Sequence, residues 1–260
     1  MTDNTLATVA AKLLEAGDVK VVIGYCRQPG ADTAIPYFAR TPQQASLLIF
    51  DDTCAPNLAV YLSKPEVRAL GRAGIVVKER DLRAVNVLLR EHVIERGDIH
   101  LIGNVDGCDT RIAESSAASP DGTAKRRIDE LESKSVEDRW AFWRGQFEKC
   151  IRCYACRQAC PLCYCKRCVV DKNTPQWIDT SPHLRGNLAW NIVRAFHLTG
   201  RCVGCGECER VCPVGIPLAT INQKMADLCT DWFGTESGIS PDERAPFTVW
   251  SPNDTDHGIL

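Results

Sequence analysis

The feature that most constrains this chain is the crowding of its cysteines into one C-terminal stretch. Of 15 cysteines in 260 residues, 11 lie between residues 150 and 212. An odd cysteine count and an N-terminus without a signal-peptide pattern argue against a secreted disulfide framework. We therefore expect a cytoplasmic protein whose thiols stay reduced and bind metal.

Eight of these cysteines form two runs with identical spacing. Each run reads C-x-x-C-x-x-C-x-x-x-C-P, the first beginning at Cys150 and the second at Cys202. In two-cluster ferredoxins with this spacing, three thiolates bind one [4Fe-4S] cluster, and the fourth, redirected by the following proline, binds the other. We therefore predict two [4Fe-4S] clusters. The predicted ligands are Cys150, Cys153, Cys156 and Cys212 for cluster one, and Cys202, Cys205, Cys208 and Cys160 for cluster two.

Two alternatives bear on the metal content. Structural zinc sites also use C-x-x-C units, but a tetrahedral ion has no use for a third cysteine at the same spacing followed by C-P. Directly after the first run, Cys163, Cys165 and Cys168 form a C-x-C-x-x-C unit. This unit either holds a third cluster or consists of buried thiols, which pack well beside apolar groups. Because no fourth ligand is identified, we favour buried thiols and leave the third cluster open.

The rest of the chain predicts an α+β fold with two domains. Over residues 1–113, short apolar runs alternate with helical periodicity, which is typical of a small α/β domain with mostly parallel strands. Asp81 is placed to cap the helix that follows the third run. The expected strands are residues 21–23, 47–50, 74–77 and 99–103, and the expected helices are residues 5–16, 57–62 and 82–93.

The C-terminal half predicts a mainly helical domain. A polar segment with Pro120 and Gly122 indicates a linker over residues 114–135. A helical pattern precedes each cysteine run, which favours a helical two-cluster ferredoxin-like domain over residues 136–229 and leaves 230–260 as an extended tail. The helix before the second run is predicted to bury the apolar stripe of Leu184, Leu188, Ile192 and Phe196.

Composition excludes several classes of partner. The formal charge is -2, from 31 basic and 33 acidic residues, so nothing points to nucleic acid. No apolar run reaches the roughly 18 residues of a membrane span. Neither G-x-G-x-x-G nor a P-loop is present, so no local motif indicates a binding site for a flavin or another nucleotide. No catalytic residue is predicted.

The cysteine runs resemble those of a known family. KCIRCYACRQACPLCYCKRC at 149–168 and GRCVGCGECERVCPVGIPL at 200–218 resemble iron–sulfur proteins related to the beta subunits of deazaflavin-coenzyme-reducing hydrogenases and formate dehydrogenases. The second run is also similar to the helical ferredoxin subunit of heterodisulfide reductases. The segments DDTCAPNLAVYL, GIVVKERDLRAVNVLL and IHLIG extend the resemblance into the N-terminal domain.

The resemblance implies an electron-transfer subunit of an anaerobic redox complex. Such a subunit relays single electrons between a flavoprotein and a catalytic oxidoreductase partner. The expected partners are subunits such as a heterodisulfide-reductase-like flavoprotein, a hydrogenase or a formate dehydrogenase.

The chain also departs from its relatives. They tend to carry a cysteine where this chain has Arg80 and another near Val105 and Asp106, whereas here the nearest thiol is Cys108. Cys54 alone stands in the expected place. The competing hypothesis is an enzyme whose N-terminal domain binds flavin or deazaflavin and exchanges hydride for single electrons through the clusters. The lack of a phosphate-binding loop favours the relay.

Overall fold

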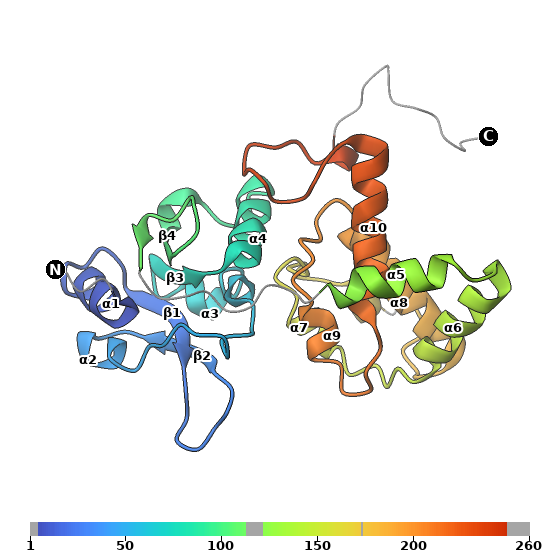
Figure 1. The fold of residues 1–260 in the computed structure, drawn as a ribbon, viewed down its shortest axis with the longest axis horizontal. Coiled ribbons are helices and arrows are strands. Elements are labelled where there is room, and N and C mark those ends of the chain that lie inside the picture. Colours follow the sequence, from blue (N-terminus) through green and yellow to red (C-terminus); the bar gives the residue numbers. More distant parts are fainter. Residues whose placement is uncertain (1–4, 113–121, 173, 249–260) are drawn as a thin grey trace.

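A five-stranded sheet and a group of helices form two lobes of this α+β chain (Figure 1). The computed structural model describes residues 5–112, 122–172 and 174–248. The sheet lobe holds the larger hydrophobic core. A second, smaller core lies among the helices that carry the cysteine runs.

The centre of the sheet is parallel, as the alternating pattern predicts. Its strands lie in the order β2-β1-β3-β4-β5, and β1 (Val21–Cys26), β3 (Ala73–Val77) and β4 (Ile99–Gly103) run parallel to one another. All five residues of β3 are buried, as expected for a strand covered on both faces. The edges are β2 (Ile35–Ala39), which pairs antiparallel with β1, and the short β5 (Thr110–Arg111).

Helices and short turns connect these strands. Thr5 caps α1 (Leu6–Glu15), and α4 (Glu79–Arg90) follows β3 directly. Asp81 is the third residue of α4, where its carboxylate accepts a hydrogen bond from the Lys78 backbone N–H at 3.2 Å. The predicted capping role of Asp81 is therefore carried out from inside the first turn. The remaining elements of this lobe are α2 (Pro42–Ala45), α3 (Pro65–Arg68), η1 (Leu58–Tyr61) and η2 (Arg96–Asp98).

Two local expectations for the sheet lobe are wrong, and one edge strand was missed. Residues 47–50 form no strand, because only Ile49 makes a bridge, to Tyr25, although Leu48 and Phe50 are buried as a strand would bury them. The expected helix at 57–62 is the single 3-10 turn η1. Strand β2 was not predicted, since its IPYFA sequence contains a proline, which a sheet tolerates mainly at an edge.

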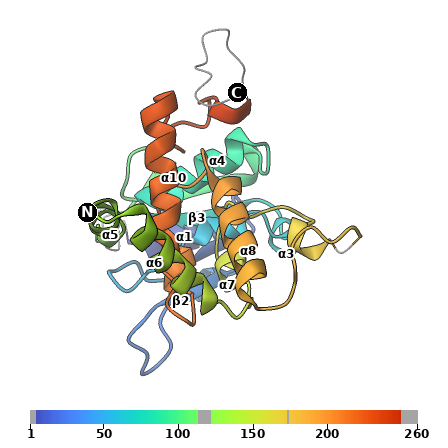
Figure 2. The ribbon, with the colours of Figure 1, turned by 90° about the vertical axis from the view of Figure 1, so that its right-hand side faces the viewer.

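The second lobe is helical, with each cysteine run preceded by the predicted helix. Figure 2 shows α6, α8 and α10 in the face of this lobe that is turned to the viewer. Helix α6 ends two residues before Cys150, and α8 ends four residues before Cys202. The elements are α5 (Thr123–Glu132), α6 (Val136–Glu148), α7 (Ala155–Gln158), η3 (Val169–Asp171), α8 (Leu184–Leu198), α9 (Glu207–Arg210), α10 (Leu218–Phe233) and η4 (Pro246–Thr248).

The segment predicted as a linker contains a helix. Residues 114–121 lie outside the described residues, but Thr123–Glu132 form α5, which packs against α10. Arg127 donates hydrogen bonds to Glu209 and Thr220. These contacts join α5 to the helical lobe, where Ile128 and Leu131 are buried.

The buried face of α8 differs from the predicted apolar stripe. Phe196 is 63% exposed, while Asn187, Asn191 and Arg194 are at most 4% exposed. These three residues recur at i, i+4 and i+7, so they lie on one face of the helix. The predicted stripe holds only in part: Leu188 and Ile192 pack against the smaller core, but Phe196 does not, and the most buried positions include polar residues. The structure instead turns a polar stripe toward the cysteine loops.

The segment after α10 returns to the sheet lobe, as Figure 1 shows. Arg83 on α4 donates to the carbonyl oxygen of Ser237 at 2.7 and 3.0 Å, and Asn86 donates to that of Gly238 at 3.0 Å. Arg80 reaches the other lobe directly and donates to the Val203 carbonyl at 2.8 Å. The first part of the predicted tail therefore belongs to the packed structure, while residues 249–260 lie outside the described residues.

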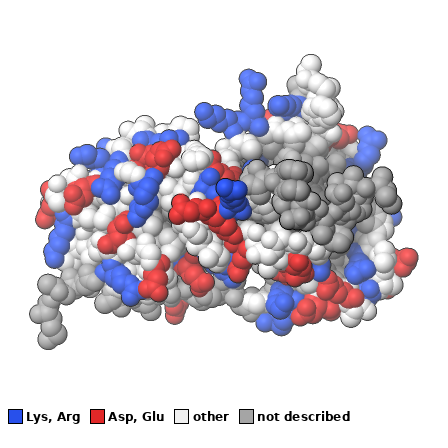
Figure 3. Space-filling model, turned by 90° about the horizontal axis from the view of Figure 1, so that it is seen from above, with Lys and Arg blue, Asp and Glu red and all other residues white. Residues whose placement is uncertain are grey.

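The surface carries both signs of charge. Lysine and arginine are interspersed with aspartate and glutamate over the face drawn in Figure 3, in keeping with a net charge of -2. Within the described ranges, no helix is both long enough and apolar enough to cross a membrane.

Candidate iron–sulfur centre

A small cavity brings together the cysteines predicted to bind cluster one. It is lined by Cys150, Cys153 and Cys156 of the first run and by Cys212 of the second. Cys156 lies on α7, whereas the other three lie in loops. Thiols that are 62 residues apart in the chain therefore meet around one space, in the pairing that the C-P spacing predicts.

Local backbone geometry shapes the first cysteine loop. Arg152 and Tyr154 both have a φ of 59°, in the left-handed region that non-glycine residues seldom occupy. The Arg152 guanidinium donates to the Gly186 carbonyl at 2.7 Å and lies over the rings of Tyr154 and Trp190. These contacts hold the strained turns between successive cysteines. Asn187 on α8 donates to the carbonyl of Cys150 at 2.8 Å and fixes the start of the loop.

A larger cavity of about 830 Å³ brings together the cysteines predicted to bind cluster two. Cys202, Cys205 and Cys208 of the second run line it together with Cys160 of the first. Gly204 and Gly206 have φ values of 67° and 77°, so the loop between the cysteines uses the left-handed turns that glycine accepts most readily. Asn222 on α10 donates to the Cys208 sulfur at 3.4 Å.

Burial favours the protonated form of several thiols in these cavities. It raises the pKa of Cys202 to about 12 and that of Cys156 to about 11. Burial also raises the pKa of Cys205, as does the proximity of Cys160. Iron binds the thiolate, so cluster assembly must displace these protons.

The donor set of each cavity suits an iron–sulfur cluster. Four soft thiolates are the ligands that such clusters prefer, and neither cavity needs a carboxylate or imidazole to complete the set. Among the described residues, no three His, Cys, Asp or Glu side chains converge as the ligands of a single metal ion would. The assignment of individual ligands remains a prediction, which the lining of the two cavities supports.

The cysteines of the C-x-C-x-x-C unit point to different surroundings. Cys163 lies beside Cys160, whose pKa is raised well above the ordinary value by a hydrogen bond between the two thiols and by burial. Cys165 is exposed, and Cys168 packs against the smaller core. The third cluster therefore remains an open prediction.

Cys54, the thiol that stands where relatives carry one, is buried in the sheet lobe. Its sulfur lies 3.8 Å from the Ile49 carbonyl oxygen, and burial raises its pKa to about 11. Burial also raises the pKa of Cys108.

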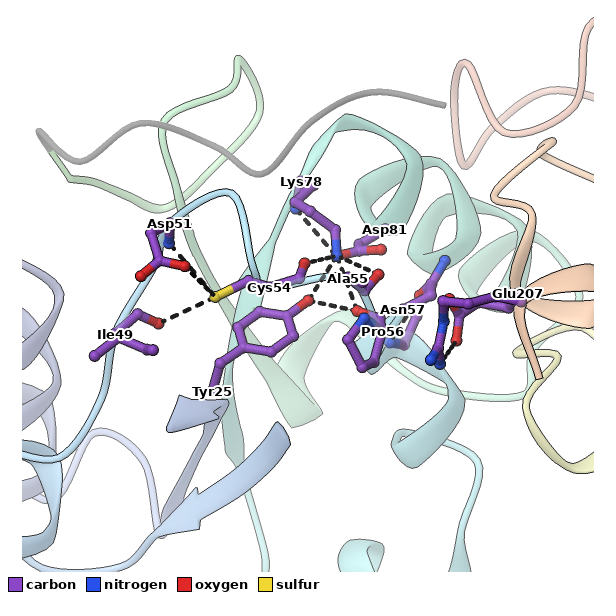
Figure 4. A network of polar contacts seen from close by, with 12 residues as sticks. Tyr25, Ile49, Asp51, Cys54, Ala55, Pro56, Asn57, Lys78, Asp81 and Glu207 are labelled. Atoms are coloured by element: carbon purple, nitrogen blue, oxygen red, sulfur yellow. Dashed lines mark hydrogen bonds and ion pairs between the residues drawn. The ribbon is translucent and has the colours of Figure 1, made fainter. Parts of the chain in front are cut away.

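A polar network from the sheet lobe forms the opposite wall of the larger cavity. Figure 4 shows the Lys78 ammonium among oxygen acceptors at the end of β3, with Asp81 beside it. Lys78 Nζ lies 2.7 Å from the Tyr25 hydroxyl and 2.8 to 3.1 Å from three successive backbone carbonyls, those of residues 54–56. Lys78, Asp81 and Asn57 all line the cavity. Sequence reasoning singled out Asp81 only as a cap and missed the other two.

In a comparison with known proteins, one family model matches the part of the chain that contains both cysteine runs. Residues 146–216 match the family model of the 4Fe-4S dicluster domain. The chain carries a dicluster domain. It is also 36% identical over 98 residues to the F420-dependent formate dehydrogenase subunit beta of Methanocaldococcus jannaschii, and 34% identical over 104 residues to the F420-dependent formate dehydrogenase 1 subunit beta of Methanococcus maripaludis.

These similarities confirm the resemblance to the iron–sulfur beta subunits. They cover 37% and 40% of this chain. The chain spans about a quarter of the length of these curated relatives, 25% and 26% respectively. The similarity therefore supports an iron–sulfur protein related to these beta subunits, and it leaves activity, substrate and partner open.

Proposed function

We propose that this chain holds two [4Fe-4S] clusters and relays single electrons between a flavoprotein and a catalytic oxidoreductase partner, within a redox complex such as a formate dehydrogenase. Cluster one would be held by Cys150, Cys153, Cys156 and Cys212, and cluster two by Cys202, Cys205, Cys208 and Cys160. Each cluster accepts and releases one electron at a time, which is the chemistry that such a relay requires.

The observation that carries this proposal is the lining of the two cavities. Each holds three cysteines of one run and the fourth cysteine of the other. The thiols of Cys156 and Cys208, one from each predicted ligand set, are close enough for the charge of one to influence the pKa of the other. Two clusters in these positions would be neighbours, so an electron could pass between them inside the protein.

Metal analysis of the anaerobically purified chain tests the proposal. About eight irons and eight acid-labile sulfides per chain, with two interacting paramagnetic centres after reduction, are expected for two clusters. About twelve irons would add a third cluster and involve the C-x-C-x-x-C unit. Zinc without iron or sulfide would overturn the proposal.

Substitution of Cys160 tests how the runs share their ligands. Because Cys160 lines the cavity of the second run, Cys160→Ser should damage cluster two and leave cluster one in place. Cys163→Ser is the matched control, since Cys163 lies beside Cys160 but is not a predicted ligand. Selective loss of cluster one from Cys160→Ser, seen by electron paramagnetic resonance, would refute the shared-ligand arrangement.

The larger cavity favours a second candidate, a subunit that also binds a flavin or deazaflavin. Its volume lies within the range of small-molecule sites, although cluster two would fill part of it. Asn57 Nδ2 and Asp81 Oδ1 are buried on its sheet-lobe wall without a hydrogen-bond partner. Release of a yellow chromophore on denaturing the purified chain would establish this candidate, and a colourless supernatant after iron removal would exclude a retained flavin.

A further inference from the structure

Arg194 on α8 lies between the two predicted cluster sites. Its side chain lines the larger cavity, and its Nη2 donates to the carbonyl of Cys156 at 3.0 Å. The same cavity is lined by Cys202, Cys205, Cys208 and Cys160. Arg194 therefore contacts Cys156 of the cluster-one set and lines the cavity that holds the cluster-two set.

Within the described residues, the charge of Arg194 has no carboxylate counter-ion. The residue is 4% exposed, and among the residues that the structure describes no aspartate or glutamate forms an ion pair with it. Its Nε is buried without a hydrogen-bond acceptor. A buried, unpaired cation is costly unless negative charge is supplied nearby.

Two other buried arginines show how this protein otherwise compensates such a charge. Arg90 has glutamates on both sides, with Glu91 at 3.4 Å and Glu243 at 3.9 Å. Arg152 lies over two aromatic rings and donates to a backbone carbonyl. Arg194 instead faces cysteines.

We propose that Arg194 is a cation shared by the two clusters, which holds both in place and raises the reduction potential of each. A four-iron cluster with four thiolate ligands carries about two negative charges when oxidised, and reduction adds a third. A fixed positive charge between two such groups in a low-dielectric interior favours the added electron on either side. This inference rests on the proposed function, since it requires clusters in both cavities.

Three variants separate charge from shape. Arg194→Gln removes the charge, Arg194→Lys keeps it, and Arg185→Gln removes a charge from the same helix at a position whose side chain is 87% exposed. Iron and sulfide content is measured first, followed by a redox titration monitored by electron paramagnetic resonance. We expect Arg194→Gln to lower the potential of both clusters by about 59 mV, the equivalent of a tenfold weaker one-electron reduction. Arg194→Lys and Arg185→Gln should stay near the wild type.

The outcomes distinguish this inference from the proposed function. A wild-type chain without two clusters would overturn the proposed function itself. If the wild type holds both clusters, potentials in Arg194→Gln that match those of Arg185→Gln, or a shift confined to one cluster, would overturn the shared cation. Loss of clusters from Arg194→Gln with full occupancy in Arg194→Lys would support a required charge. Loss from both variants would show that the shape of the arginine matters, and would overturn the inference.

Discussion

At the scale of single residues, Asp81 is a carboxylate that the fold buries at a cost. It is 1% exposed, and its Oδ1 has no hydrogen-bond partner. Burial raises its pKa to about 6, although Lys78 opposes this effect. Its other oxygen accepts from the Lys78 backbone N–H and lies 3.4 Å from the Lys78 ammonium. Asp81 therefore connects the start of α4 to the network of Lys78, while the burial of its negative charge is only partly compensated.

The raised pKa of Asp81 predicts a pH-dependent stability. Its folded pKa lies above the ordinary value of 3.8, so between these values the folded state binds more protons and its free energy of unfolding falls as the pH rises. The expected loss from this group is about 1.4 kcal/mol between pH 5 and pH 7.5. Asp81→Asn should flatten that part of the dependence in anaerobic denaturant titrations.

Glu79→Gln provides the control for this prediction. Glu79 lies in the same first turn of α4 but is exposed. Its substitution should leave the slope of unfolding free energy against pH unchanged between pH 5 and 7.5. An Asp81→Asn variant with the wild-type slope would show that Asp81 does not titrate in this range.

The residues of the site were unequally predictable from the sequence. The eight cysteines follow from spacing alone, because the C-P run is a local pattern with a known geometry. Arg194 and Asn187 have no such signal. In the sequence they lie next to residues of the predicted apolar stripe. Only the fold shows that their face of α8 is turned toward the cysteine loops. A polar side chain is predicted as exposed until its buried partners are known.

At the scale of elements, the segment after α10 acts as a strap between the lobes. Its Gly238 has a φ of 78°, and a Cβ at this position would lie 2.3 Å from the carbonyl oxygen of Arg83 on α4. The backbones of strap and helix therefore approach as closely as a glycine allows. The strap was predicted as an extended tail because its contacts with α4 span about 150 residues of sequence.

Gly238→Ala should release this strap from α4. The left-handed conformation costs a residue with a Cβ about 1 to 2 kcal/mol, and the overlap with the Arg83 carbonyl adds to that cost. We expect faster hydrogen exchange in residues 235–240 and at Arg83. Gly234→Ala is the matched control, because Gly234 has a φ of 66° but a Cβ added there would meet no atom within 4 Å. Equal exchange in the two variants would contradict the close approach.

The elements of the sheet were predicted where the local pattern was strong. Strands β1, β3 and β4 are mostly buried and largely aliphatic; β3 and β4 were predicted to within one residue of their ends, whereas only residues 21–23 of β1 were predicted. Residues 47–50 have the same apolar character but form only one bridge, Tyr25 to Ile49, on the edge of β1 that β3 pairs with over Val21–Ile23. Whether an apolar segment becomes a strand depends on pairing with a strand distant in the sequence, and a local pattern does not contain that information.

At the scale of the whole molecule, the two lobes differ in what holds them together. The sheet lobe has an extensive aliphatic core that includes β1, β3 and β4. In the described part of the helical lobe, the main core cluster has eight buried residues, two of which are the predicted ligands Cys156 and Cys208, while Leu162, Leu198 and Val203 pack into the core of the sheet lobe. Without a bound metal or a disulfide, a core of this size stabilises a domain only weakly. The clusters should therefore supply much of the folding free energy of the helical lobe.

Removal of iron should thus loosen the helical lobe and spare the sheet. In an apo chain prepared anaerobically with chelator and reductant, hydrogen exchange should rise strongly across α6, α8 and α10. The amides of β3 and β4, which are paired in the parallel sheet, should keep their protection because their core contains no predicted ligand of cluster one. Residues of the sheet lobe that line the larger cavity, such as Lys78, are expected to change only modestly. Equal loss of protection in β3 and α8 would mean that the two lobes unfold as one unit, and unchanged exchange in α8 would mean that its small core is sufficient without clusters.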